Sequence, residues 1–196
     1  MTGPGAAGRL SIDRGARVLR FIRFIKMIHT EMSSNDFWNF SATLYSEHGV
    51  ADSCLALQNE HGLDVNLVLF CIWYGKYHGE LSSSQLDELL GFSLLWATNV
   101  VKPLRQARRW IKQNRDDCQI PARRLESFRE RVKKLELEAE QLQQNRLQQL
   151  VQTNSGISED NPAGAIQGNL GHYLQCAGVK KSESVIRHLL IITDAL

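Results

Sequence analysis

One uninterrupted apolar stretch constrains the fold of this chain most strongly. From Leu67 to Tyr74 every side chain is apolar or aromatic. A helix that is apolar on all sides must be buried on all sides or lie in lipid. The stretch is far shorter than the roughly 20 residues that a helix needs to cross a bilayer. It therefore predicts the central helix of a small helical bundle.

Two polar residues stand at the start of this helix. Asp64 suits the N-cap position, where a carboxylate accepts hydrogen bonds from the free amides of the first turn. Asn66 follows just inside, next to the expected core. Capping is the commoner role for such residues. The alternative is a small ligand pocket formed by Asp64, Asn66 and Trp73.

Three His-Gly pairs predict where the first helices end. They are His48-Gly49, His61-Gly62 and His78-Gly79. Glycine takes the left-handed conformation at a helix C-terminus without steric cost. The expected helices cover residues 36–47, 51–61 and 64–78. Helices with such short links usually run antiparallel, which separates His61 from the other two histidines, so we expect no shared metal site.

A longer helical pattern follows Ser82. Its apolar positions recur every three or four residues, at Leu86, Leu90, Leu94, Ala97, Val101, Leu104 and Ile111. Pro103 lacks an amide donor and clashes with the preceding turn. Either the helix bends there, or a new helix begins with Pro103 in its first turn.

The second half of this pattern is strongly basic. The candidate partner- or anion-binding residues are Lys102, Arg105, Arg108, Arg109 and Lys112. A basic helix face with Trp110 among its cations suits nucleic acid, another polyanion or an acidic partner protein. The alternative is a solvated face whose cations pair with acidic neighbours.

A heptad pattern appears after the break at Pro121. Apolar residues alternate at steps of three and four, at Leu125, Phe128, Val132, Leu135, Ala139 and Leu142. This is the spacing of a coiled-coil seam. The stripe 125–142 requires a partner: the bundle itself, a second copy or another protein. A polar linker at 153–164 and two further helices, at 165–176 and after Ser182, complete the chain.

The N-terminal extension is separate in character. Residues 1–31 carry six basic and two acidic residues, a net charge of +4, whereas the rest of the chain carries −2. Basic residues recur at every third position of 17–28, which gives no clean amphipathic face. Three interpretations remain: a helix for a membrane surface or partner, a helix packed on the bundle, or a mis-assigned start with translation beginning at Met27 or Met32.

No catalytic, nucleotide-binding or metal-binding motif occurs, which favours a non-enzymatic protein without a bound cofactor. The weaker alternative is an enzyme or ligand-binding protein with its pocket near Asp64, Asn66 and Trp73. The four cysteines, Cys54, Cys71, Cys118 and Cys176, are widely scattered, without the spacing of metal ligands. They are typical of reduced thiols in a cytoplasmic protein. We expect no membrane contact except through 17–28.

The segment from Phe37 to Arg109 resembles an all-helical family of unknown function found mainly in gammaproteobacteria. The matching motifs are Phe37-Trp38-x-Phe40, Leu44-Tyr45, Gly49-Val50, Cys54-Leu55-x-Leu57-Gln58, Asp64-Val65-Asn66-Leu67, Trp73, Trp96 and Val101-Lys102-Pro103-Leu104-Arg105-x-x-Arg108-Arg109. The resemblance implies a small helical protein of the bacterial cytoplasm and implies no activity.

The expected fold is all-α: a compact bundle of four or five helices, then a long charged helix and a helical tail. The expected segments are a basic extension at 1–31, the bundle core at 32–115, a coiled-coil-like helix at 116–153, and a linker with two short helices at 154–196. The function we expect is protein interaction or an adaptor role, and the alternative is nucleic-acid or polyanion binding by the basic face at 102–112.

Overall fold

The computed structural model describes residues 36–151 and 161–196, and every regular element within these two ranges is a helix. The elements are α2 Phe37–Ser46, α3 Val50–Glu60, α4 Val65–Tyr77, α5 Ser83–Trp96, the π-helical turn η2 Ala97–Val101, α6 Lys102–Gln113, α7 Ala122–Leu150, α8 Pro162–Cys176 and α9 Glu183–Thr193. The prediction of an all-α fold is confirmed. The expectations about 1–31, the segment 17–28 and most of the linker lie outside the described residues.

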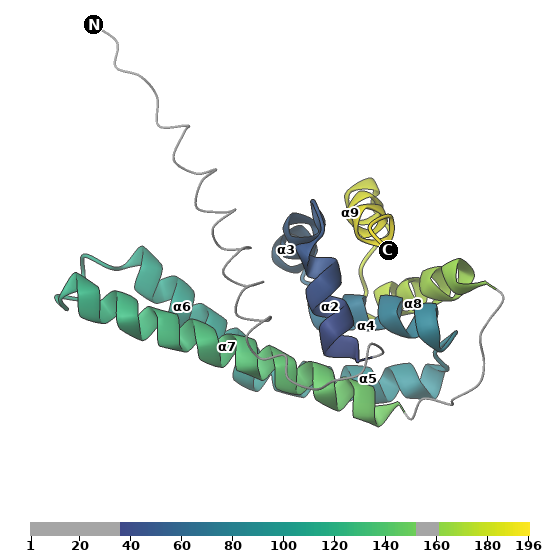
Figure 1. Ribbon diagram of the computed structural model, residues 1–196, viewed down its shortest axis with the longest axis horizontal. Coiled ribbons are helices and arrows are strands. Elements are labelled where there is room, and N and C mark those ends of the chain that lie inside the picture. The colour runs from purple at the N-terminus through teal and green to yellow at the C-terminus, as the bar shows by residue number, and fades with distance from the viewer. Residues whose placement is uncertain (1–35, 152–160) are drawn as a thin grey trace, which may run out of the picture.

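The helices form a bundle and a projecting arm (Figure 1). The bundle contains α2, α3, α4, α5, α8, α9 and the C-terminal half of α7. Helix α6 and the N-terminal half of α7 lie side by side and extend away from the bundle. Within the described residues, no helix is both long enough and apolar enough to cross a membrane.

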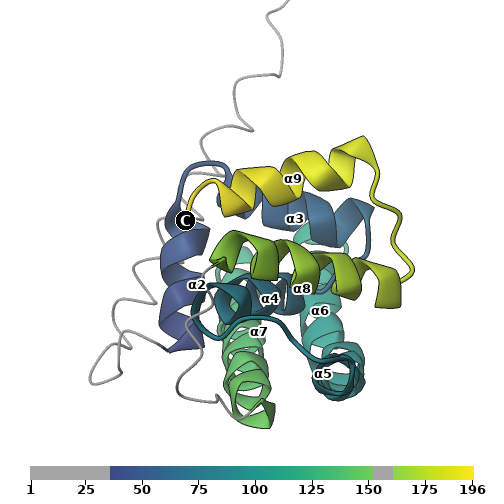
Figure 2. The same ribbon diagram turned by 90° about the vertical axis from the view of Figure 1, so that its right-hand side faces the viewer.

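Helix α4 is the centre of the bundle, as its apolar run predicts. Every side chain from Leu67 to Tyr74 is buried. Figure 2 shows α4 behind α8, with α3 and α9 on one side and α5 and α7 on the other. Gly75 allows the close approach of α8, because a Cβ atom at this position would lie 2.7 Å from the backbone nitrogen of Ile166.

The predicted helix ends agree with the backbone. The side chain of Asp64 caps α4 by accepting a hydrogen bond of 2.9 Å from the backbone amide of Asn66. The glycines of the three His-Gly pairs all have positive φ, at 80° for Gly49, 71° for Gly62 and 91° for Gly79. Only glycine adopts this region at little cost, so each pair stops a helix.

Helices α5 and α6 are joined through η2 into one bent rod that runs antiparallel to α7 (Figure 1). One row of buried or partly buried positions runs along the rod through Leu86, Leu89, Ser93, Trp96, Val101, Leu104, Arg108 and Ile111. Their steps are three or four residues, except for a step of five across the π-helical turn. One extra residue in this turn keeps both halves of the rod facing α7. Helix α6 then begins at Lys102 with Pro103 in its first turn.

The sequence pattern predicts that Leu94 on the rod lies in the core, and this prediction is wrong. Leu94 is 66% exposed, and the neighbouring Ser93 is 1% exposed. The Ser93 hydroxyl donates a hydrogen bond of 2.5 Å to the Asp64 carboxylate. Ser93 therefore takes the core position, because the Asp64 carboxylate accepts a hydrogen bond from its hydroxyl there.

Helices α8 and α9 belong to the same core as α4. Their buried apolar side chains are Ile166, Leu170, Tyr173, Leu174, Val185, Leu189 and Ile192. Asn169 of α8 donates to the carbonyl oxygens of Cys71 and Gly79 and accepts from the amide of Leu81. The bundle core thus extends well beyond residues 32–115.

Candidate binding surface on the helical arm

The arm, defined as residues 102–134, is opposite in net charge to the other described residues. It carries twelve basic and four acidic residues, a net charge of +8. The other described residues, 36–101, 135–151 and 161–196, carry five basic and thirteen acidic residues, a net charge of −8. A small apolar cluster that includes Ile111, Leu125 and Val132 holds α6 against α7 within the arm.

Two of the candidate cations are occupied by acidic residues of α7. Arg105 donates to Glu136 at 2.9 Å and to Glu140 at 2.6 Å. Arg108 forms a second ion pair with Glu136. These guanidinium groups hold α6 on α7 and offer little charge to an outside ligand.

The pKa values of the two acidic partners, Glu136 and Glu140, are shifted in opposite directions. Burial alone would raise the pKa of Glu136, but the hydrogen bonds and positive charges of Arg108 and Arg105 outweigh it, and the pKa lies below its ordinary value. For Glu140, burial outweighs the pull of Arg105 and raises the pKa to about 7. Glu136 therefore stays ionised beside the two arginines, whereas Glu140 binds a proton as the pH falls through about 7.

The other three candidate cations are exposed. Lys102 and Lys112 face solvent, and Arg109 donates a hydrogen bond of 2.7 Å to the side-chain oxygen of Asn59 on α3. Trp110, between them, is 57% exposed. The basic face at 102–112 thus divides into a paired half, which faces α7, and an accessible half.

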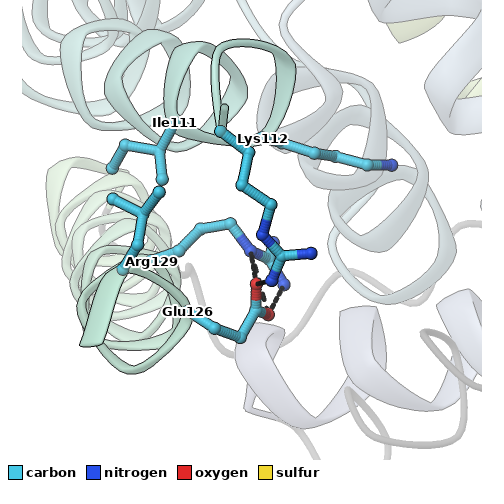
Figure 3. A pocket seen from close by; sticks show the side chains of 6 residues that line it. Ile111, Lys112, Glu126 and Arg129 are labelled. Atoms are coloured by element: carbon cyan, nitrogen blue, oxygen red, sulfur yellow. Dashed lines mark hydrogen bonds and ion pairs between the residues drawn. The ribbon is translucent and has the colours of Figure 1, made fainter. Parts of the chain in front are cut away.

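The far end of the arm carries a small hollow of about 110 Å³ between α6 and α7. Arg129 and Glu126 form an ion pair along the α7 side of it, and Arg115 reaches the same carboxylate at 3.0 Å from beyond the end of α6 (Figure 3). The lining residues are Ile111, Lys112, Arg115, Leu125, Glu126 and Arg129. Its polar lining groups are largely engaged with one another.

The heptad stripe on α7 is divided between two environments. Leu125, Val132 and Ala139 are buried against the rod. The alternate residues, Phe128, Leu135 and Leu142, are 49%, 52% and 52% exposed. We call these three residues the docking line. Because they lie seven residues apart, they form one exposed row along α7, next to the buried row.

The three candidate pocket residues, Asp64, Asn66 and Trp73, do not come together. Asp64 and Asn66 belong to a hydrogen-bonded cluster at the start of α4. The second carboxylate oxygen of Asp64 accepts from Ser93 at 2.5 Å and from Gln143 at 2.8 Å. The Asn66 amide donates to Gln143 and accepts from Gln144, both at 2.8 Å. The backbone amide of Asp64 donates to the Tyr173 hydroxyl at 2.9 Å.

Trp73 lies elsewhere. It is nine residues from Asp64 along α4, about 13 Å at the helical rise. Its ring packs with the rings of Phe37 and Phe70, with centroids 5.4 Å away in both cases. Trp73 therefore belongs to the aromatic core, and the Asp64 carboxylate joins helices α4, α5 and α7.

Sequence reasoning missed two parts of these sites. The partners of Asp64 and Asn66 are up to 109 residues away in the chain, and glutamines on an otherwise charged helix give no signal of burial. Arg123 and Arg124 were also passed over. They are exposed in the first turn of α7, where the helix dipole disfavours positive charge. Two arginines at this position are therefore unusual, and the sequence shows them directly.

Neither the comparison with curated proteins nor the comparison with solved structures gave a match. A family model matches residues 36–147, which is more than half of the chain and includes α2 to α6 and nearly all of α7. The match covers the Asp64 cluster except for Tyr173, and also covers the ion-paired half of the basic face and the docking line. The chain belongs to the family described as proteins of unknown function, DUF2390.

Proposed function

We propose that this chain is a non-enzymatic interaction protein that binds a helix of a partner protein along the docking line of α7. The observation that carries this proposal is the exposure of Phe128, Leu135 and Leu142 at heptad spacing. Single exposed apolar residues are common on protein surfaces. A regular row of large ones on a helix is what a second helix packs against.

The surroundings of Asp64 support a role without catalysis. A catalytic carboxylate needs an open position for its substrate. Both oxygens of Asp64 instead accept hydrogen bonds from the protein itself. Buried, reduced thiols support a cytoplasmic location: the free cysteines Cys54 and Cys71 each have a pKa raised to about 12 by burial.

A photo-crosslinking amino acid at position 135 tests the proposal in living cells. We expect covalent protein adducts from position 135, because its side chain would lie inside the interface. The matched control is the same group at Thr43, an exposed position on α2. Equal adduct yields at the two positions, or none at position 135, would contradict the proposal.

A second candidate function, binding of nucleic acid or another polyanion, is favoured by the net charge of +8 on the arm. Arg123 and Arg124 support it, because they are exposed and no ion pair of either is found among the described residues. Phosphate contacts release counterions, so such binding weakens steeply with salt.

Retention on a heparin or DNA column tests this candidate. We expect the double variant Arg123→Glu with Arg124→Glu to elute at clearly lower salt than the wild type. Lys180→Glu with Lys181→Glu makes the same charge change on exposed residues between α8 and α9, and should elute as the wild type does after correction for net charge. Identical shifts in both variants would exclude a specific role for the arm.

A further inference from the structure

The docking line is complementary to itself in one orientation. If two copies of α7 pack antiparallel with Leu135 on the twofold axis, Leu135 meets the partner's Leu135. Phe128 then meets the partner's Leu142 at each end. A twofold interface uses the same patch on both subunits, so this self-matching is what it requires. We propose that the partner of the docking line is a second copy of this chain in this antiparallel arrangement, an inference that rests on the proposed function.

Charges beside the docking line favour the antiparallel orientation. Arg131 and Glu138 are exposed and lie on the same flank of the row, four residues before and three after Leu135. The Arg131 guanidinium already lies over the Phe128 ring, 5.5 Å from its centroid. In the antiparallel pair, Arg131 comes level with the partner's Glu138, and the reverse contact forms as well. A parallel pair would instead leave Arg131 and the partner's Glu138 about 10 Å apart along the helix axis, too far for an ion pair.

The charge distribution of the whole molecule favours the same arrangement. Antiparallel packing brings the arm, with its charge of +8, beside the other described residues of the partner, which carry −8. Helix α5 runs antiparallel to α7, as the hydrogen bonds from Trp96 to Ala139 and from Gln143 to Ser93 establish. Its exposed residues Asp87 and Glu88 therefore lie about level with residues 147–149 of α7. The partner's Arg123 reaches this level.

The contact is short for a permanent dimer. Successive members of the docking line are about 10 Å apart along the helix, so the row spans about 21 Å. Interfaces of this size are usually weak or transient. We therefore expect a dimer that forms with rising concentration and that weakens with salt, because charge complementarity contributes to it.

Sedimentation equilibrium on the full chain tests the association. From about 5 to about 500 µM, the range of weak complexes, the wild type should move from the monomer mass of 22.2 kDa towards twice that value. Leu135→Glu places two carboxylates on the axis and should raise the dissociation constant at least about tenfold. Leu190→Glu is the matched control, because Leu190 is 51% exposed on α9, on the opposite side of the bundle from α7 (Figure 1).

Charge exchange tests the orientation. Arg131→Glu and Glu138→Arg should each weaken the dimer about threefold or more, and the two together should restore it, because the antiparallel contacts then form with reversed signs. Circular dichroism melting of each variant checks that the fold is kept. If the double variant loses as much binding free energy as the two single variants added together, the antiparallel arrangement is wrong.

The outcomes separate this inference from the proposed function. A wild type that stays monomeric at all concentrations overturns the dimer. If position 135 nevertheless crosslinks to a different protein, the docking function stands with another occupant. If dimers appear only with added DNA, the polyanion and not the second copy drives assembly, and the inference is also overturned. A monomer without adducts at position 135 rejects both.

Discussion

At the scale of single residues, the most informative group is the polar cluster around Asp64. Gln143 donates to Asp64 and to Ser93 and accepts from Asn66, all at 2.8 Å, while being 1% exposed. A buried polar group that loses its partner keeps the full cost of its desolvation. One glutamine on α7 thus satisfies polar groups on two other helices, α4 and α5.

Replacement of Gln143 by leucine should therefore destabilise the fold strongly. We expect a loss of about 2–4 kcal/mol in the free energy of unfolding, because Asp64 and Asn66 lose buried partners at once. Urea denaturation followed by circular dichroism measures it. Gln149→Leu makes the same change at an exposed position of α7 and should stay within about 0.5 kcal/mol of the wild type.

Glu140 predicts a dependence of stability on pH. Its pKa rises from an ordinary value of 4.5 to about 7 in the folded protein, chiefly through burial. The folded state therefore binds more protons than the unfolded state between these values. This contribution to stability is fully present below about pH 4.5 and is lost as the pH rises through about 7.

The variant Glu140→Gln should remove this pH dependence. Between pH 5 and pH 8 it should gain about 1–2 kcal/mol relative to the wild type, less than the full shift implies because 24% of the side chain is exposed to screening solvent. Denaturant unfolding at both pH values measures the difference. Glu60→Gln, at an exposed position of α3, should show no such change, and an equal gain there would contradict the assignment.

At the scale of the elements, two contacts determine how the helices assemble. Helix α4 meets α8 at Gly75, where backbone nearly touches backbone. Helix α7 meets the rod through the paired cations of α6 and through alternate members of its heptad stripe. The other members of the stripe remain on the surface as the docking line.

Two glycine variants separate packing from helix propensity. Gly75→Ala should cost more than about 2 kcal/mol, because overpacking against a backbone cannot relax by moving a side chain. Gly91→Ala, on α5, has open space around the added methyl group and should gain about 0.5–1 kcal/mol from helix propensity alone. Thermal or urea unfolding measures both, and a stabilised Gly75→Ala would show that α4 and α8 are not in close contact.

At the scale of the whole molecule, the fold depends on helices outside the family match. The match ends at residue 147, whereas α8 and α9 cover α4 and share its core. Without them, the apolar side chains of α4 that face α8 would be exposed to water. The matched region therefore does not contain the whole hydrophobic core of this chain.

A truncated chain tests this dependence. A chain ending at Val151 should lose its cooperative unfolding transition and its near-ultraviolet circular dichroism and should bind hydrophobic dyes, because α4 would lack one covering layer. Cooperative unfolding of the shorter chain ending at Val151 would contradict the role of α8 and α9.

Local sequence signals determined much of this fold. The apolar run from Leu67, the His-Gly pairs, the cap at Asp64 and the break at Pro103 all act within one or two turns, so their consequences are readable without neighbours. The heptad spacing on α7 was readable for the same reason. The family resemblance over 37–109 is confirmed by the match over 36–147.

Only the tertiary structure decided which faces of these helices are used. Periodicity marks a stripe but cannot say which of its members meets a neighbour, and so it could not separate Val132 from Leu135 on α7. Burial of Ser93 in place of Leu94, pairing of Arg105 with Glu136 and Glu140, and the glutamine cluster at Asp64 all join residues far apart in the chain. Such contacts follow from how helices pack, and the packing is a property of the assembled core.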